Sequence, residues 1–105
     1  MAHRLSSETE DDLDELWYYI ATQSGSAEIA DRLVDAITRR FFLLSGYPEA
    51  GRKRDHDLRP GVRTFPVGEY LIAYRLDGSD VLILRVLRGS RDVEALLRND
   101  PQLEG

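Results

Sequence analysis

The chain has 105 residues, a length that predicts a single domain, and its 42% hydrophobic and 31% charged residues are ordinary for a globular protein. It contains no cysteine, which excludes disulfides, thiolate metal sites and a cysteine nucleophile and suits a reducing compartment. The formal net charge of −5 argues against direct binding to nucleic acid. We therefore expect one domain over residues 1–105, with residues 98–105 as a frayed tail.

The sequence carries no signal for secretion or membrane insertion. The first five residues, Met-Ala-His-Arg-Leu, lack the apolar core of a signal peptide. Apolar runs such as those at 41–44 and 81–84 are far too short to span a bilayer. We therefore expect a cytoplasmic protein that does not contact membranes.

The charges are divided unevenly along the chain. Residues 1–38 hold nine acidic and two basic side chains, residues 39–91 hold six acidic and eleven basic ones, and residues 92–105 hold four acidic and one basic. The net charges of these segments are therefore −7, +5 and −3. The basic middle segment indicates either a surface that faces an acidic partner or a solvated surface whose charges pair within the chain.

The chain begins with the pattern of a short strand followed by a helix. Residues 2–6 are typical of an edge strand with Leu5 pointing inward, and Ser7 with Glu10 matches a capping box that begins a helix. Four apolar residues then recur at helical spacing and predict the buried stripe of this helix: Leu13, Leu16, Trp17 and Ile20.

A second amphipathic helix follows after a short connection. Ser26 predicts its N-cap, and Gly46 with Pro48 predicts its end. Because the connection is short, we expect the two helices to lie antiparallel as a hairpin. The apolar stripe of the second helix comprises Ala30, Leu33, Val34, Ile37, Phe41 and Leu44.

The second half of the chain changes to the period of β-strands. Residues 47–57 are typical of a polar loop, and residues 62–67 and 70–76 predict two strands. Pro66 favours an edge or strand-end position, because proline cannot donate a hydrogen bond to a neighbouring strand.

Asp77-Gly78 predicts a tight hairpin turn into a third strand over residues 81–87. This strand is apolar on both faces and is therefore expected in the centre of the sheet. One of its faces must meet the helical hairpin, and something else must cover at least part of the other. Strict alternation places Val81, Ile83 and Leu87 on one face and Leu82, Leu84 and Val86 on the other.

Gly89-Ser90 then predict a break, and residues 91–97 predict a short helix. The element order is therefore β-α-α-β-β-β with a small C-terminal helix. The fold class is α+β, with a helical hairpin packed on a small antiparallel sheet.

This order of elements resembles the RelE/ParE toxin fold, and the ParE branch in particular. The resemblance covers roughly residues 5–97. The order and spacing of the matching segments carry it, rather than any one of them. The segments lie at 12–20 in the first helix, at 48–52 and 58–59 after the helices, and at 70–75 and 81–92 in the strands.

The resemblance implies that the protein is the toxin of a type II toxin–antitoxin pair. Such a toxin is held inactive in a hetero-oligomeric complex by a cognate antitoxin, expected here to be ParD-like with a ribbon-helix-helix start. The antitoxin's C-terminal segment wraps along the helical hairpin and the sheet. ParE-like members inhibit DNA gyrase by binding, whereas RelE-like members cut messenger RNA on the ribosome.

The chemistry of the side chains distinguishes these two branches. RNA cleavage requires a base, an acid and cations that hold the phosphate. RelE-like ribonucleases place a Tyr or His near the C-terminal end of the sheet, whereas residues 88–94 here read Arg-Gly-Ser-Arg-Asp-Val-Glu. Arginine stays protonated and is a poor general base, so the ParE-like, non-nucleolytic branch is favoured. The available cations are Arg59, Arg63, Arg75, Arg85, Arg88 and Arg91.

We expect contacts with the antitoxin or the target from exposed aromatic and guanidinium groups. Trp17 is expected in the core, whereas its neighbours on the helix lie nearer the flank. Arg91 has an alternative interpretation, in which Ser90 caps the last helix and Asp92 sits in its first turn. The predicted contact residues are Tyr18, Tyr19, Arg59, Arg63, Arg88 and Arg91.

Two other functions remain open from the residues alone. One is a RelE-like messenger-RNA endonuclease that uses His56 or Tyr74 for proton transfer. The other is a non-toxic relative that only binds an antitoxin. The chain has no metal-ligand spacing, phosphate-binding glycine loop or nucleophile motif, so we expect neither a metal nor a cofactor.

Overall fold

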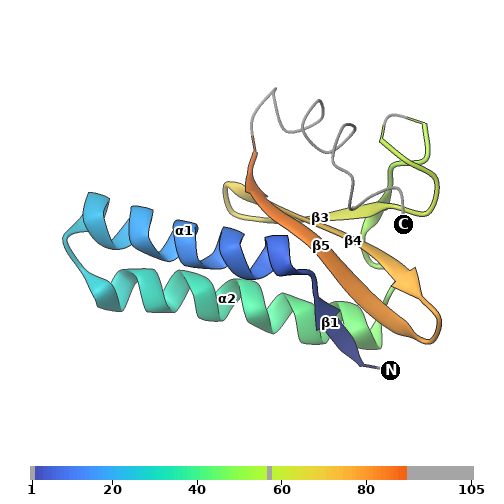
Figure 1. Ribbon diagram of the computed structural model, residues 1–105, viewed down its shortest axis with the longest axis horizontal. Coiled ribbons are helices and arrows are strands. Elements are labelled where there is room, and N and C mark those ends of the chain that lie inside the picture. The colour runs from blue at the N-terminus through green and yellow to red at the C-terminus, as the bar shows by residue number, and fades with distance from the viewer. Residues whose placement is uncertain (1, 57, 90–105) are drawn as a thin grey trace.

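The computed structural model describes residues 2–56 and 58–89, and its elements follow the predicted order (Figure 1). β1 (His3–Leu5) leads directly into α1 (Ser7–Ser24), and α2 (Ala27–Gly46) returns alongside it in the opposite direction. The remaining strands are β2 (Arg52–Lys53), β3 (Arg63–Val67), β4 (Tyr70–Asp77) and β5 (Asp80–Arg88).

The strands form one sheet in the order β1-β5-β4-β3-β2, with the helical hairpin against one face. The α+β class and the helical hairpin on a small sheet are therefore confirmed. The sheet is mixed rather than wholly antiparallel, because β1 runs parallel to β5 with His3 opposite Val81. No hairpin turn joins β1 to β5. The direction of β1 relative to β5 is therefore set by the position at which β1 leads into α1.

Three details of the strands can be compared with the predictions from the sequence. The predicted loop at 47–57 contains β2, whose two exposed polar residues give no hydrophobic period that would reveal a strand. Pro66 lies beyond the end of β2, so its missing amide costs no hydrogen bond and the strand-end prediction is confirmed. The β4–β5 turn is also as predicted, with Gly78 at a φ of +65°.

The main core lies between the helical hairpin and one face of the sheet. It encloses the predicted stripe of α2 and, from the sheet, the side chains of Ile72, Tyr74 and Ile83. Burial of each large apolar side chain contributes about 1.5–3 kcal/mol, so this interface is the main source of stability. The helical residues in or against this core are Leu13, Leu16, Ile20, Leu33, Val34, Ile37, Phe41 and Leu44.

Trp17 lies differently from the prediction. It is only half-buried, at the seam between the helices, where its indole N–H donates a hydrogen bond of 2.8 Å to Asp31 of α2. A buried indole needs a hydrogen-bond acceptor, and the main core offers none at this position. The prediction that Trp17 belongs to the core is therefore wrong.

The start of α1 also lies one residue earlier than predicted. Ser6, not Ser7, is the N-cap, and its hydroxyl accepts a hydrogen bond of 3.0 Å from the amide of Thr9. Ser6 is favoured because its side chain also reaches β5, as described below. Ser26 caps α2 as predicted, accepting from the amide of Ile29.

β5 contains an irregularity that strict alternation does not predict. Its register with β4 shifts so that Leu84 is an extra residue, which is the definition of a β-bulge. The faces of residues 81–84 are as predicted, but beyond the bulge they are exchanged. Val86 therefore packs against the helices and Leu87 lies on the opposite face, the reverse of the prediction.

The face of the sheet that points away from the helices is partly covered by the chain itself. Leu58 and Val62, from the segment between β2 and β3, pack there against Ala73 and Leu84. The predicted short helix at 91–97 and the predicted tail at 98–105 lie outside the described residues. Among the residues described, no helix has the length and apolar composition that crossing a bilayer requires.

Candidate interaction site

Tyr19 and Arg88, two of the predicted contact residues, meet where α1 passes the end of β5. The Arg88 Nη1 donates a hydrogen bond of 3.1 Å to the Tyr19 hydroxyl, and its guanidinium carbon lies 5.7 Å from the centroid of the Tyr19 ring. The Arg88 Nη2 lies 3.3 Å from the carboxylate of Glu69, in the turn between β3 and β4. Tyr19, Glu69 and Arg88, which are far apart in the sequence, thus meet on one surface, and we call them the Tyr19–Arg88 cluster.

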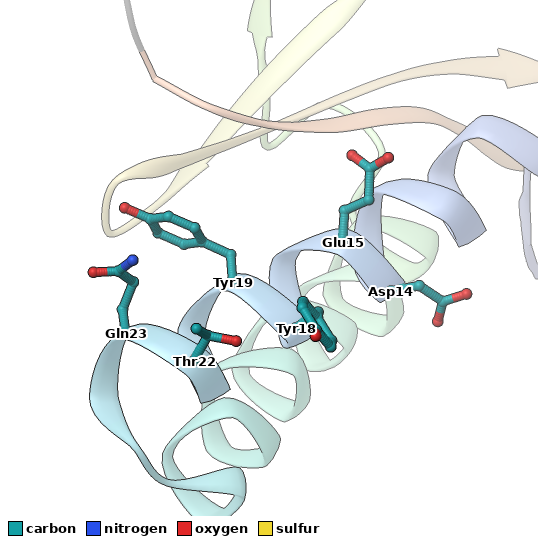
Figure 2. A pocket seen from close by; sticks show the side chains of 6 residues that line it. All are labelled: Asp14, Glu15, Tyr18, Tyr19, Thr22 and Gln23. Carbon is teal, nitrogen blue, oxygen red and sulfur yellow. The ribbon is translucent and has the colours of Figure 1, made fainter.

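Two shallow hollows meet at Tyr19. One, with a volume of about 460 Å³, runs along α1 between Tyr18 and Tyr19 (Figure 2). The other, with a volume of about 220 Å³, lies between α1 and the end of β5 and is lined in part by Tyr70 and Arg88. Figure 2 shows Tyr19 pointing toward the sheet, whereas Tyr18 points away in a different direction.

This surface has the composition of a protein-binding site. Tyr18 is 71% exposed and Tyr19 is 45% exposed, so both rings offer apolar area to a partner. Asp14 and Glu15 line the hollow beside the two rings, and the Arg88 guanidinium lies against Tyr19. Exposed tyrosines beside an arginine are typical of the residues that dominate binding energy at protein interfaces.

The same cluster is poorly suited to proton transfer. The hydrogen bond to Tyr19 raises the pKa of Arg88 further above its ordinary value, so the guanidinium stays charged. Burial raises the pKa of Tyr70, which lies beneath Arg88, so its phenol stays protonated at neutral pH. The cluster can therefore hold acidic or aromatic groups, and neither Arg88 nor Tyr70 provides a base near neutral pH.

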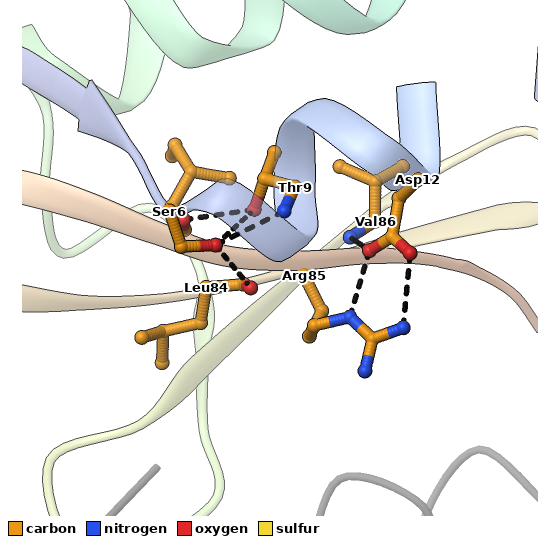
Figure 3. Close-up of polar contacts among 7 residues, drawn as sticks. Ser6, Thr9, Asp12, Leu84, Arg85 and Val86 are labelled. Carbon is orange, nitrogen blue, oxygen red and sulfur yellow. Dashed lines mark hydrogen bonds and ion pairs between the residues drawn. The ribbon is translucent and has the colours of Figure 1, made fainter. Parts of the chain in front are cut away.

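The position of the α1 tyrosines depends on how the start of α1 is fixed to β5. β1 ends opposite Ile83, and beyond this point the first residues of α1 take its place along the edge of β5 (Figure 3). The hydroxyl of Thr9 donates to the Ile83 carbonyl at 2.9 Å, and the hydroxyl of Ser6 donates to the Leu84 carbonyl at 2.8 Å. Side chains thus satisfy backbone groups that a longer β1 would have paired.

Asp12 continues this edge one turn further along α1. Its carboxylate accepts two hydrogen bonds from Arg85, of 2.8 and 2.9 Å, and one of 3.0 Å from the amide of Val86. The side chains of Asp12 and Arg85 are only 8% and 16% exposed. A bidentate ion pair in such a position fixes the helix and the strand in one geometry.

Sequence reasoning missed this pair, because it grouped Arg85 with the surface cations and did not single out Asp12. One signal was available. Ser6, Thr9 and Asp12 recur at a spacing of three residues and form a polar row along one side of the helix start. Such a row suggests a helix face that meets backbone or charge, although it does not identify the partner.

The other predicted contact residues do not join the Tyr19–Arg88 cluster. The Arg63 Nη1 donates to the carbonyls of Gly51 and Glu49, at 2.9 and 3.4 Å, and so holds the turn after α2. Arg59 is half-buried in the segment between β2 and β3, directly after Leu58 of the second apolar cluster. Arg91 lies outside the described residues.

The two residues considered for catalysis are also far from a catalytic arrangement. Tyr74 is completely buried, and its hydroxyl donates to the Pro48 carbonyl at 2.7 Å and accepts from the Gly51 amide at 2.8 Å. Both bonds go to backbone groups, and burial raises its pKa, so the structure gives no support to a role for Tyr74 in proton transfer. His56 is exposed in the segment between β2 and β3. In the described ranges, no three His, Asp or Glu side chains are grouped as metal ligands.

Comparisons with known proteins agree with this geometry. Residues 4–93 match a family model described as ParE toxin of type II toxin-antitoxin system, parDE. Toxin ParE3 from Caulobacter vibrioides is 41% identical over 86 residues, an alignment that covers 82% of this chain and 84% of that protein. A solved structure described as Chromosomal ParDE TA system from P. aeruginosa has a TM-score of 0.75 at 25% identity, covering 86% of this chain and 97% of the other.

Proposed function

Because this chain belongs to the ParE toxin family of type II toxin–antitoxin systems, we propose that it arrests growth by binding and inhibiting DNA gyrase. A cognate antitoxin neutralises it in a hetero-oligomeric cytoplasmic complex. That antitoxin is ParD-like, with a ribbon-helix-helix start. The observation that carries the proposal is the family match over residues 4–93.

The engagement of the cations supports inhibition by binding rather than RNA cleavage. Arg85 is bound by the Asp12 carboxylate, and Arg63 is bound by backbone carbonyls. Arg88 is exposed, and its guanidinium donates a hydrogen bond to the hydroxyl of Tyr19. These three arginines are therefore not gathered around one phosphate position, as cleavage would require.

The Tyr19–Arg88 cluster is the surface that we propose for contact with the antitoxin or with gyrase. Tyr18 and Tyr19 supply the aromatic area, and Arg88 presents its remaining N–H groups to an acidic side chain of the partner. Asp14 and Glu15 beside the tyrosine rings would attract basic groups of the partner, whereas Arg88 would attract acidic ones. A partner segment that carries both signs of charge therefore fits this surface best. Arg59 and Arg63 stay as weaker candidates, because neither lies in this cluster. Arg91 lies outside the described residues and stays a candidate as predicted.

The gyrase assignment is tested with the purified chain and purified gyrase. We expect the chain to block supercoiling, and we expect its induction in cells to stop growth with a DNA-damage response. Coexpression of the antitoxin encoded beside it should restore growth. Normal supercoiling at a large excess of the chain would reject gyrase as the target, and cleavage of messenger RNA at codon positions would point to the RelE-like alternative.

The contact surface is tested with a matched pair of arginine variants. Arg88 and Arg4 are 54% and 53% exposed, and each forms a surface ion pair with an acidic residue. We expect Arg88→Ala to weaken antitoxin affinity or gyrase inhibition tenfold or more, and Arg4→Ala to change both by less than about twofold. Equal effects of the two variants would show that the Tyr19–Arg88 cluster has no special part in binding.

A further inference from the structure

The end of α2 carries a second exposed apolar surface, which the proposed function does not use. Phe42 and Tyr47 are each 69% exposed, and Leu43 between them is 38% exposed. We call these three residues the α2-end surface. Beside it lies an open hollow of about 660 Å³, lined by Leu43, Gly46, Tyr47, Pro48, Glu49 and Ala50.

The α2-end surface is separate from the Tyr19–Arg88 cluster. The helices are antiparallel, so the end of α2 lies beside β1 and the start of α1, whereas Tyr19 lies near the end of α1 (Figure 1). The two surfaces are therefore at opposite ends of the helical hairpin. One partner segment of a few turns cannot cover both.

Contacts within the fold hold the α2-end surface in one shape. The ring of His3 in β1 packs edge-on against Phe42, with 4.8 Å between the ring centroids. The buried Tyr74 hydroxyl binds the Pro48 carbonyl and the Gly51 amide, and so fixes the turn that follows Tyr47. A surface that is already ordered loses little conformational entropy when a partner binds, and this favours a docking role.

Exposed basic side chains lie next to this surface along α2. Arg39 and Arg40 are exposed one turn before Phe42 and Leu43 on α2, and β2 adds the exposed Arg52 and Lys53 soon after the hollow in the sequence. Within residues 2–56 and 58–89, none of these four cations is paired with a carboxylate. A partner would therefore gain most if it brought acidic groups to the rim.

We propose that the α2-end surface docks an acidic amphipathic helix of a partner protein. Aliphatic side chains of that helix, spaced i and i+3 or i+4, fill the hollow beside Leu43 and Tyr47, and its carboxylates lie beside Arg39 and Arg40. The hollow favours a protein over a nucleic acid, because its lining contains no cation and includes the acidic Glu49 beside apolar groups. The partner helix therefore turns aliphatic side chains toward the hollow and keeps its carboxylates on the side of Arg39 and Arg40. This docking does not depend on gyrase inhibition.

The proposal is tested by selecting random 16-residue phage-displayed peptides on the full chain. We expect the enriched peptides to be rich in Asp and Glu, with aliphatic residues at helical spacing. A fluorescently labelled peptide from this set is then titrated against variants by anisotropy. Tyr47→Ala should weaken its binding tenfold or more, whereas Tyr18→Ala, which removes an equally exposed tyrosine at the other surface, should change it by less than twofold.

The charge requirement has its own matched pair on the same helix. Arg40→Glu should weaken binding of the labelled peptide at least threefold, and Arg32→Glu, about two turns nearer the start of α2, should leave it within twofold. Thermal melting checks that each variant is folded. Because every replaced side chain is exposed, we expect the melting temperatures to match the unaltered chain.

Three results would overturn the proposal. The first is enrichment of basic or neutral peptides, or of peptides that bind the Tyr47→Ala variant equally well. The second is tighter binding of a single-stranded oligonucleotide that Tyr47→Ala abolishes, which would make the partner a nucleic acid. The third is self-association that depends on Tyr47 and excludes the peptides, which would make the occupant a second copy of the chain. None of these results bears on gyrase inhibition, which the supercoiling assay tests separately.

Discussion

The Tyr74 hydroxyl shows how one polar atom in the core can determine the shape of a surface turn. Both of its hydrogen bonds go to backbone groups, those of Pro48 and Gly51, in the turn after α2. Gly51 is required there for a steric reason, because a Cβ atom at this position would overlap the Tyr74 ring. Arg63 adds a third bond, to the Gly51 carbonyl.

Replacing Tyr74 with phenylalanine should therefore destabilise the protein at neutral pH. The Gly51 amide and the Pro48 carbonyl lose their partner in a buried position, which costs about 1–3 kcal/mol. The free energy of unfolding from chemical denaturation measures this. Tyr18→Phe is the control and should stay within about 0.5 kcal/mol, since Tyr18 is exposed. Equal stability of the two variants would contradict the structural role of Tyr74.

The raised pKa of Tyr74 also predicts a dependence on pH. Burial keeps the proton on the folded phenol above its ordinary pKa of 10.0, so the unfolded chain ionises first. Stability from this group is fully present below pH 10 and falls as the pH rises beyond it. Tyr70 acts in the same direction, because burial also raises its pKa. Unfolding measured from pH 8 upward should show a shallower fall above pH 10 for Tyr74→Phe than for the unaltered chain.

Two glycine substitutions should have opposite consequences. Gly51→Ala places a methyl group against the enclosed Tyr74 ring, and we expect a loss of about 1–3 kcal/mol. Gly46→Ala, at the last residue of α2, meets open space and should be neutral or stabilise by up to about 1 kcal/mol. Thermal or denaturant unfolding of both variants provides the measurement. A harmless Gly51→Ala would mean that the Tyr74 ring can move aside.

At the scale of elements, the attachment of α1 to β5 decides where the interaction site lies. β1 covers only three residues, and Ser6, Thr9 and Asp12 then continue along the edge of β5 in place of a strand. The bulge at Leu84 falls in this same stretch and turns Val86 toward the helices. This attachment fixes α1 and β5 relative to each other. Tyr19 lies further along α1 and Arg88 lies further along β5, so the attachment also determines the distance between them.

Removal of the Asp12 carboxylate should therefore weaken this attachment strongly. Asp12→Ala leaves the guanidinium of Arg85 without this carboxylate in a site of low exposure, and such a loss costs about 3–5 kcal/mol. Asp11→Ala, at the exposed neighbouring position, should change stability by no more than about 0.5 kcal/mol.

A double-mutant cycle isolates the pair itself. The double variant of Asp12→Ala and Arg85→Ala should lose less than the sum of the two single losses, since each single variant already removes the ion pair between the two side chains. Additive losses in denaturant unfolding would show that the two side chains act independently. Because Asp12 also accepts from the Val86 amide, some loss should persist in the double variant.

At the scale of the whole molecule, the chain buries one core well and leaves aromatic groups exposed at both ends of the helical hairpin. The main core between hairpin and sheet is continuous, whereas on the opposite face the described residues Leu58 and Val62 form a smaller apolar cluster with the sheet. A domain of this size buries about two-thirds of its unfolded surface, so its own stability is modest. A partner that covers exposed apolar groups would add to this stability.

The proposed antitoxin should therefore raise the melting temperature of the chain. With the antitoxin at about 100 times its Kd, the added stability is about 2.7 kcal/mol, which corresponds to a rise of roughly 10–20 °C for a domain of this length. Scanning calorimetry of the chain with and without antitoxin measures this. An Arg88→Ala chain should show a smaller rise at the same antitoxin concentration. An unchanged melting temperature at saturating antitoxin would contradict neutralisation by binding to the folded toxin.

Much of the fold could be predicted from local patterns in the sequence. The stripe of α2, the cap at Ser26 and the turn at Gly78 depend on residues a few positions apart, so periodicity and turn chemistry suffice to identify them. The two-sided apolar pattern of β5 likewise indicated a central strand, and it lies between β1 and β4. Tyr18 and Tyr19 were expected at the flank, because the helical stripe left them outside it.

Tertiary structure alone decided which distant groups meet. The sequence pattern predicted Ser7 as the helix cap and placed Arg85 among the available cations. In the structure Ser6 is the cap and binds β5, and Asp12 binds Arg85. The bulge at Leu84 lies in the pairing of β5 with β4, and the alternation of apolar residues does not reveal it. The parallel direction of β1 and the meeting of Tyr19 with Arg88 depend on contacts between segments about 70–80 residues apart. The energies of these contacts arise only when packing brings the segments together, and no local period records them.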